Sequence, residues 1–298
     1  MLELQLVGYI CLIYINAKCS SALPISLSVF NCNLLALHNA NRCTGHGFSS
    51  HIPMGMGYHF IEGISYIKRV ANHFGLERFN LMGHSMGGAM CAVFAATFPN
   101  EVLRLIELDA LLPIQRPVET VVERTKSSVE QMLTFEEKIV RGSSPTYSYD
   151  EAKTKLLKDY SNFHGQECLT SHAADALLLR GLTKSSNTED NNKTFTFSRD
   201  VRHRVPGIYG YPSLMWQEFG KRISCPHLVV SAEPKPSYFD PGTAEASRKV
   251  CEDSNADFSV QVVSGTHFVR GHPFLHSRHV QIWIRSISGA SEPSKNSF

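Results

Sequence analysis

The chain has 298 residues, of which 43% are hydrophobic and 19% charged, and its formal net charge is +2. These values are ordinary for a globular protein, and the length suits one large α/β domain or a domain with an insertion. Lys and Arg are scattered along the chain, which argues against a nucleic-acid-binding surface. The eight cysteines include no C-x-x-C pair. They are therefore predicted to be reduced thiols, and neither a disulfide framework nor a zinc site is expected.

Residues 1–43 form an atypical N-terminal segment. The run from Leu4 to Ala17 is apolar and free of charge, but it is too short to span a bilayer. Glu3 precedes it and no Lys or Arg does, which is the wrong pattern for a signal peptide. We expect one or two buried strands here, and hence a cytoplasmic protein without membrane association. Secretion through this run is the alternative, and a glycosylation sequon at Asn192 is compatible with it.

Beyond residue 44, helical and strand-like patterns alternate along the chain. Apolar residues at helical spacing, stop signals such as Gly75 and Pro99, and short apolar runs define these elements. The predicted elements are a helix at 58–74, strands at 79–82 and 103–109 flanking a helix at 89–98, strands at 226–232 and 258–263, and a helix at about 273–287. Strands that alternate with helices predict a doubly wound, mostly parallel sheet, whose first strands we expect to be missing or degenerate.

The stretch from 113 to 224 interrupts this alternation. It is more polar, has helical patterns, and contains no convincing buried strand. We interpret it as a helical lid inserted into an α/β core formed by residues 44–112 and 225–288. The polar residues 289–298 are expected to be a disordered tail.

The most informative motif is Gly83-His84-Ser85-Met86-Gly87, between an apolar strand and an apolar helix. A serine at such a junction forms a nucleophile elbow, in which the strained backbone exposes the hydroxyl and the crowding requires Gly83 and Gly87. The following helix directs its N-terminal N–H groups, including that of Met86, at developing negative charge. The alternative interpretation is a glycine-rich turn for tight helix–strand packing.

A nucleophilic serine needs a base, which in this architecture comes last along the chain. His267 follows the last predicted strand and is the expected base. His272, His276 and His279 fall on the following helix, and without nearby Asp, Glu or Cys ligands they do not predict a metal site.

The acid that orients the base has two candidates. Asp240 follows the penultimate strand, which is the commoner position, and is preferred. Asp109 closes the strand at 103–109 and is the alternative acid.

Several segments resemble the serine hydrolase-like proteins, an animal branch of the α/β-hydrolase superfamily. They are "GHGFSSH", "GHSMGG", "LIELDALLP", "LLLRGLTK", "FTFSRDVRHR", "YFD" and "SGTHFVRGHP", within about residues 44–288. The resemblance implies that Ser85 is the nucleophile, that His267 is the base, and that the insertion is a lid over the substrate pocket. It also implies an upstream His-Gly loop that supplies a second oxyanion donor, yet no His-Gly dipeptide precedes His46-Gly47.

Together these observations predict a serine hydrolase without cofactor or metal, acting on a small-molecule ester or related acyl compound through an acyl-enzyme. The alternative is a catalytically impaired or inactive relative that binds a ligand or a partner, because the oxyanion hole lacks its N-terminal loop.

Overall fold

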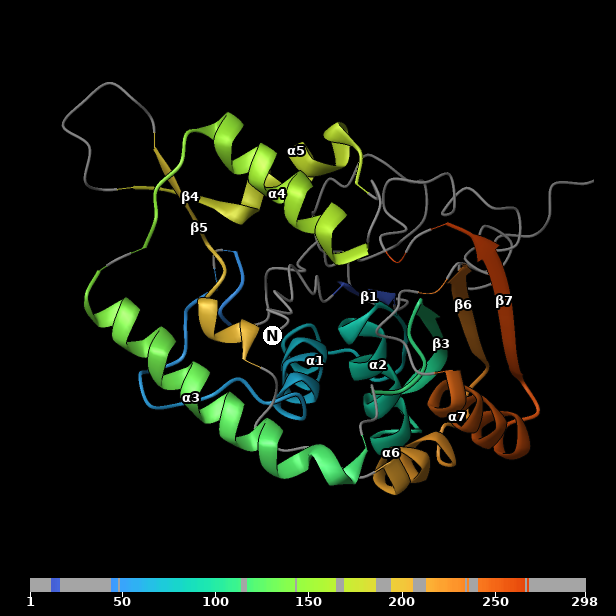
Figure 1. The fold of residues 1–298 in the computed structure, drawn as a ribbon. Helices are drawn as coiled ribbons and strands as arrows, with labels where there is room; N and C mark the ends of the chain where they lie inside the picture. Colours follow the sequence, from blue (N-terminus) through green and yellow to red (C-terminus); the bar gives the residue numbers. More distant parts are fainter. Residues whose placement is uncertain are drawn as a thin grey trace, which may run out of the picture.

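The computed structural model describes residues 12–16, 44–47, 49–113, 117–142, 144–164, 169–185, 194–205, 213–233, 235, 241–265 and 267. Its central sheet has the order β1-β2-β3-β6-β7 (Figure 1). The strands are β1 (Leu12–Asn16), β2 (Phe79–His84), β3 (Val102–Leu108), β6 (His227–Glu233) and β7 (Phe258–Ser264). The last four are parallel, and β1 pairs antiparallel with β2. The expected α/β fold with a mostly parallel sheet is therefore confirmed.

The helices that accompany this sheet are α1 (Glu62–His73), α2 (Met86–Thr97), α6 (Ser213–Gly220) and α7 (Pro241–Ser254). The central one is α2, which packs on β2 and β3 and is flanked by α1 and α6. Residues 87–96 of α2 are all buried. Because α2 is buried on every side, its sequence has no polar face.

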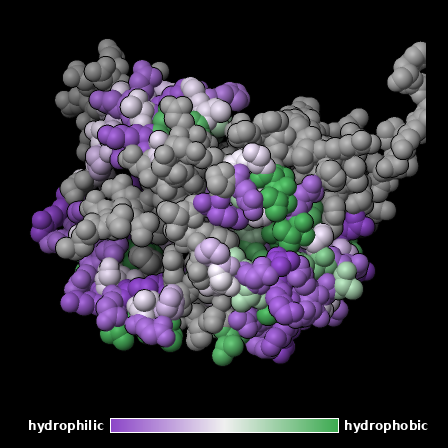
Figure 2. Space-filling view, turned by 45° about the vertical axis from the view of Figure 1, so that its right-hand side comes forward, coloured by the Kyte–Doolittle hydropathy of each residue, from purple (hydrophilic) through white to green (hydrophobic). Residues whose placement is uncertain are grey.

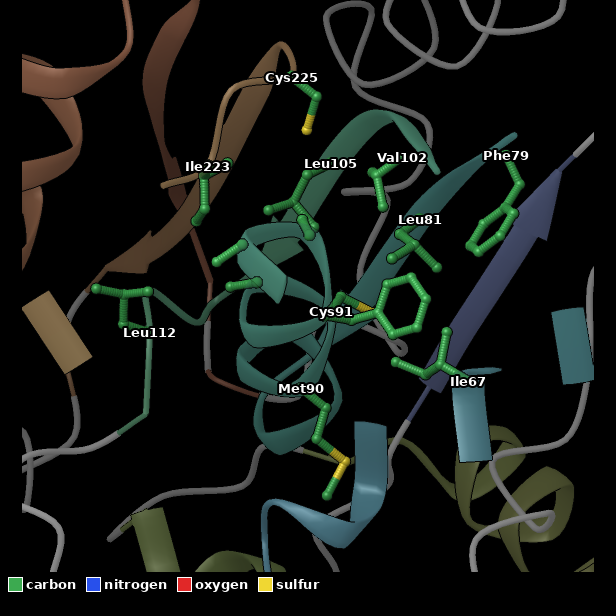
Figure 3. Close-up of a cluster of buried hydrophobic side chains, with 14 of the residues drawn as sticks. Ile67, Phe79, Leu81, Met90, Cys91, Val102, Leu105, Leu112, Ile223 and Cys225 are labelled. Carbon is green, nitrogen blue, oxygen red and sulfur yellow. The ribbon is translucent and has the colours of Figure 1, made fainter. Parts of the chain in front are cut away.

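The main hydrophobic core surrounds α2 (Figure 3). Phe79 and Leu81 of β2 and Leu105 of β3 are almost fully buried in it. The described cysteines Cys91, Cys225 and Cys251 are free thiols in or beside this core. Burial raises the pKa of Cys225 to about 11 and that of Cys251, with help from nearby carboxylates, to about 12. These two thiols are therefore protonated and unreactive at neutral pH.

The segment between β3 and β6 is largely helical. It contains the short turns η1 (Val118–Thr120) and η2 (Val201–Arg204) and the helices α3 (Val121–Val140), α4 (Tyr149–His164) and α5 (Ser171–Gly181), before α6. It also contains β4 (Leu182–Lys184) and β5 (Phe195–Phe197), which pair with each other and join no described strand of the central sheet. Figure 1 shows α4, α5, β4 and β5 grouped together, apart from that sheet.

A buried ionic cluster joins this segment to the loop before α1. Asp200, 1% exposed, accepts hydrogen bonds from the Tyr58 hydroxyl (2.8 Å) and the Arg202 guanidinium (Nη2 at 2.7 Å). Arg202 also donates to the carbonyl oxygens of Ile52 (2.6 Å) and Pro53 (2.8 Å). These bonds satisfy both buried charges, as burial of an ion pair requires. The "SRDVRHR" segment therefore fixes the insertion to the core.

Two histidines lie beside this cluster. The rings of His46 and His203 are 4.0 Å apart, and His203 Nε2 donates to the Thr44 carbonyl oxygen at 2.8 Å. Burial, reinforced by nearby positive charge, lowers the pKa of His46 to about 3 and that of His203 to about 4. Both rings are therefore neutral at physiological pH.

The far edge of the described sheet is β7. On it, Val260 and Val262 are exposed. Figure 2 looks at this side of the molecule, where hydrophobic residues gather within a largely hydrophilic surface. Within the described ranges, no helix is long and apolar enough to cross a membrane. The predicted helix at 273–287, the tail at 289–298 and most of residues 1–43 lie outside those ranges.

Candidate active site

The backbone at Ser85 is strained. Its φ of 54° and ψ of −126° are unusual for a residue with a side chain, and it sits between the end of β2 and the start of α2. Although Ser85 is the N-cap residue of α2, its hydroxyl makes no capping hydrogen bond to the helix. The strained turn thus directs the hydroxyl away from the helix end and toward His267, as expected for a nucleophile elbow.

Glycines make this turn possible. A Cβ atom at Gly83 would lie 2.4 Å from the carbonyl oxygen of Gly87, so the strand and the helix could not approach as they do. A Cβ atom at Gly88 would lie 2.8 Å from Cβ of Ala110. The sequence predicted Gly83 and Gly87 at this turn but missed Gly88, which the second glycine of "MGG" could have indicated.

His267 connects the serine to an acid. Its Nε2 lies 2.8 Å from Ser85 Oγ, and its Nδ1 lies 2.6 Å from Asp109 Oδ2. All three residues are buried, each less than 9% exposed. A carboxylate only accepts hydrogen bonds, so Nδ1 carries the proton and Nε2 is left to accept from the serine hydroxyl. This tautomer is the one that a general base requires.

The carboxylate beside His267 is that of Asp109, which the sequence analysis named as the alternative to Asp240. Asp109 lies directly after β3, with a left-handed φ of 44°. Its Oδ1 accepts a hydrogen bond from the Ala232 amide at 2.9 Å. The position at His267 Nδ1 that the sequence assigned to Asp240 is thus occupied by the alternative acid. Asp240 itself lies outside the described residues.

Lys235 is a further charged group at this site, and no sequence pattern predicted it. Its ammonium group forms an ion pair with Asp109 Oδ1. Burial of Asp109 raises its carboxyl pKa, but the hydrogen bond and electrostatic attraction of His267, together with the positive charge of Lys235, outweigh that effect. The net result is an Asp109 pKa well below its usual range, so this group is ionised at physiological pH.

His84 also contacts His267. Its Nε2 donates to the carbonyl oxygen of His267 at 2.7 Å, and the two rings lie 4.9 Å apart. His84 directly precedes Ser85, so one turn of chain carries both the serine and a hydrogen-bond donor to His267. The sequence analysis did not single out His84, although it lies inside the elbow motif.

The N-terminus of α2 begins at Met86, immediately after the serine. Unpaired N–H groups at a helix N-terminus and the helix dipole favour negative charge at this point. Within the described ranges, no group of three or more His, Cys, Asp or Glu side chains is arranged to hold a metal ion. His272, His276 and His279 fall outside those ranges.

The family model described as "alpha/beta hydrolase fold" matches residues 44–269. Among curated proteins, a probable serine hydrolase of Drosophila melanogaster is 30% identical over 75% of this chain and 65% of its own length. Human serine hydrolase-like protein 2 is 34% identical over 47% of this chain and 43% of its own length. The chain therefore matches less than two thirds of the length of either relative.

A solved structure of a hypothetical protein from Pseudomonas aeruginosa PAO1 superposes with a TM-score of 0.65 at 22% identity. The match covers 82% of this chain and 79% of that one. This likeness shows the fold alone, whereas the curated relatives bear out the resemblance to serine hydrolase-like proteins. The family match covers most of the chain, and the central sheet agrees with it. The chain belongs to the α/β hydrolase fold family.

Proposed function

We propose that this chain is a serine hydrolase that cleaves carboxylic esters or related acyl compounds through a covalent acyl-enzyme. One observation carries the proposal: a continuous chain of hydrogen bonds from Ser85 Oγ through the imidazole of His267 to Asp109. In this proposal Ser85 is the nucleophile, His267 the general base and Asp109 the acid.

The proposed reaction begins when Ser85 Oγ attacks the carbonyl carbon of the acyl group. The hydroxyl proton moves to His267 Nε2, and Asp109 stabilises the imidazolium that forms. The oxyanion of the tetrahedral intermediate faces the Met86 N–H at the N-terminus of α2. His267 then returns its proton to the leaving alcohol, and the same base activates water to release the acid from Ser85.

The curated relatives named above carry the description serine hydrolase or serine hydrolase-like protein, which supports hydrolysis as the reaction class. The second candidate is a relative with impaired turnover. Among the described residues, the Met86 amide at the N-terminus of α2 is the oxyanion donor that we identify, without a second one. Loss of one donor typically lowers kcat by about 100- to 1000-fold.

Hydrolysis of p-nitrophenyl acetate by the purified chain tests the proposal. We expect slow but saturable turnover that is lost in Ser85→Ala and in His267→Ala, while both variants keep the circular dichroism spectrum of the parent. Turnover that survives in Ser85→Ala would contradict the assigned nucleophile. An acyl-enzyme that accumulates without turnover would identify the impaired form.

A further inference from the structure

His267 is bonded through its main chain as well as through its ring. The ring nitrogens lie within hydrogen-bond distance of Ser85 and Asp109, whereas the carbonyl oxygen accepts from His84 Nε2 at 2.7 Å. A carbonyl oxygen only accepts, so His84 Nε2 carries a proton and is the donor of this bond. Because that nitrogen is committed as a donor, it does not act as a second base toward Ser85.

The ring of His84 has a fixed place in the fold. It is the last residue of β2, a strand that pairs with β1 on one side and with β3 on the other, and it is 4% exposed. The amide of the next residue, Ser85, donates to the carbonyl oxygen of Leu108 at 3.0 Å. A ring buried in a close-packed interior on a paired strand has little freedom to move. His84 is therefore a rigid donor for the main chain of the base.

The elbow contacts the base twice, through two consecutive residues. Ser85 Oγ bonds the ring of His267, and His84 bonds its carbonyl oxygen. The two hydrogen bonds and the atoms between them form a closed loop, so the base cannot drift from the serine without breaking one of the bonds. A general base needs this fixed distance, because it must stay within hydrogen-bond reach of the proton that it takes.

The bond between Ser85 and His267 does not last through the proposed reaction. Once Ser85 Oγ carries the acyl group, it has no proton to donate to His267 Nε2. The base must nevertheless stay in place, because it then activates the water that releases the acid. In the acyl-enzyme, Asp109 still holds Nδ1 of the ring and His84 still holds the main chain. The contact with His84 therefore matters most in the second half of the reaction.

We propose that His84 is a positioning residue for the general base, and that it keeps His267 in place while the acyl-enzyme is hydrolysed. This inference rests on the proposed function and assigns a residue to one step of it, deacylation. His84 acts through the main chain of His267 and takes no proton itself.

Steady-state and burst kinetics with p-nitrophenyl acetate test the role of His84. The ester is activated, so kcat reports deacylation and kcat/KM reports acylation. His84→Phe keeps a ring but has no donor, and its kcat should fall about tenfold while kcat/KM falls less than about threefold. KM should therefore fall and the burst should remain.

Two further variants control this experiment. His84→Gln, whose side-chain amide can donate to the same carbonyl oxygen, should recover most of the lost kcat. His73→Phe removes an exposed histidine of α1 and should behave as the parent chain does. Equal losses of kcat and kcat/KM in His84→Phe, or a kcat in His84→Gln as low as in His84→Phe, would overturn the inference.

Proton NMR tests the contact without any turnover. An imidazole N–H bonded to a carboxylate resonates far downfield, so the bond from His267 Nδ1 to Asp109 should give such a signal in the parent chain and none in His267→Ala. In His84→Phe this signal should broaden or vanish, because a ring that is held less firmly exchanges its proton with water faster. His84→Leu, whose volume is closer to that of histidine, serves if His84→Phe does not fold.

The NMR result separates this inference from the proposed function. A downfield signal that is unchanged in His84→Phe would overturn the positioning role even in an active chain. A signal that weakens in His84→Phe, in a parent chain that shows neither turnover nor an adduct on Ser85, would support the positioning of His267 by His84 and contradict the proposed hydrolase activity.

Discussion

The Asp109 carboxylate divides its oxygens between two sets of partners. Oδ2 accepts from His267, whereas Oδ1 accepts from the Ala232 amide and the Lys235 ammonium. The second set holds the carboxylate in place beside the imidazole. Lys235 is therefore expected to act as a positioning residue for Asp109.

Replacing Lys235 by Met tests this role. Without the ammonium group, Asp109 Oδ1 keeps the Ala232 amide as its hydrogen-bond partner but loses the ion pair, so the carboxylate is held less firmly beside His267. The kcat/KM for p-nitrophenyl acetate should therefore fall about two- to fivefold, as the loss of an ion pair worth about 0.5 to 1 kcal/mol implies. Lys249→Met, which removes an exposed ion pair with Asp253, is the control and should leave kcat/KM unchanged. An unchanged kcat/KM in Lys235→Met would show that the ion pair does not position Asp109.

Ser85 and His267, which the structure places in hydrogen-bond contact, were both predictable from the sequence. Ser85 lies in an elbow motif, and His267 follows the last strand directly. The acid has no such signature. Chain order favoured Asp240, while the left-handed backbone at Asp109 and the ion pair with Lys235 are tertiary features that a linear pattern does not reveal.

Among the elements, β3 and β6 are joined by a fully buried polar pair. Glu107 Oε1 lies 2.8 Å from His227 Nε2, and both residues are 0% exposed. Neither Glu107 Oε2 nor His227 Nδ1 has a hydrogen-bond partner among the described residues. Each group therefore depends on the other, and the loss of one leaves its partner buried and unpaired.

Glu107→Leu should lower the free energy of unfolding by about 3 kcal/mol or more, measured by urea denaturation. The reason is that it leaves His227 buried without its hydrogen-bond partner. The double variant Glu107→Leu/His227→Leu should recover part of that loss, since an apolar pair needs no hydrogen bond. A double variant that is less stable than Glu107→Leu would indicate that packing volume, not the unpaired ring, sets the cost.

The cluster that fixes the insertion to the core should make stability depend on pH. His203 has a folded-state pKa of about 4, below the ordinary value of 6.5. Between these values the unfolded chain binds a proton that the native state does not, so stability falls as pH decreases from about 6.5 to 4. His203→Gln, which retains a donor for the Thr44 carbonyl, should reduce this slope by at most about 1.4 kcal/mol per pH unit. Parallel curves of unfolding free energy against pH would contradict the prediction.

Elements with a strong apolar pattern were predictable, and β2, β3, β6, β7, α1 and α2 lie where apolar runs or helical spacing indicated them. The missed elements lack such a pattern. Each strand of the β4–β5 pair is three residues long, and α7 buries only Ser247 and Cys251 along its length. Such elements are stabilised by neighbours from distant parts of the chain, which local periodicity does not report.

Over the whole molecule, the candidate site depends on three separate parts of the fold. The ends of the parallel strands β2 and β3 bring Ser85 and Asp109 to one edge of the sheet, and the turn after β7 carries His267 to the same place. This convergence at the carboxyl ends of parallel strands is where doubly wound sheets place their ligands. The antiparallel strand β1 borders β2 on the opposite side from β3.

The most direct test of the proposed function is covalent labelling with a fluorophosphonate probe, followed by mass spectrometry of the modified peptide. We expect a single adduct on Ser85, formed quickly by the parent chain, absent in Ser85→Ala, and slowed in Asp109→Asn, in which residue 109 no longer carries a charge. A rapid adduct on another residue, or no adduct on a folded parent chain, would contradict the assignment of Ser85, His267 and Asp109 as a working catalytic triad.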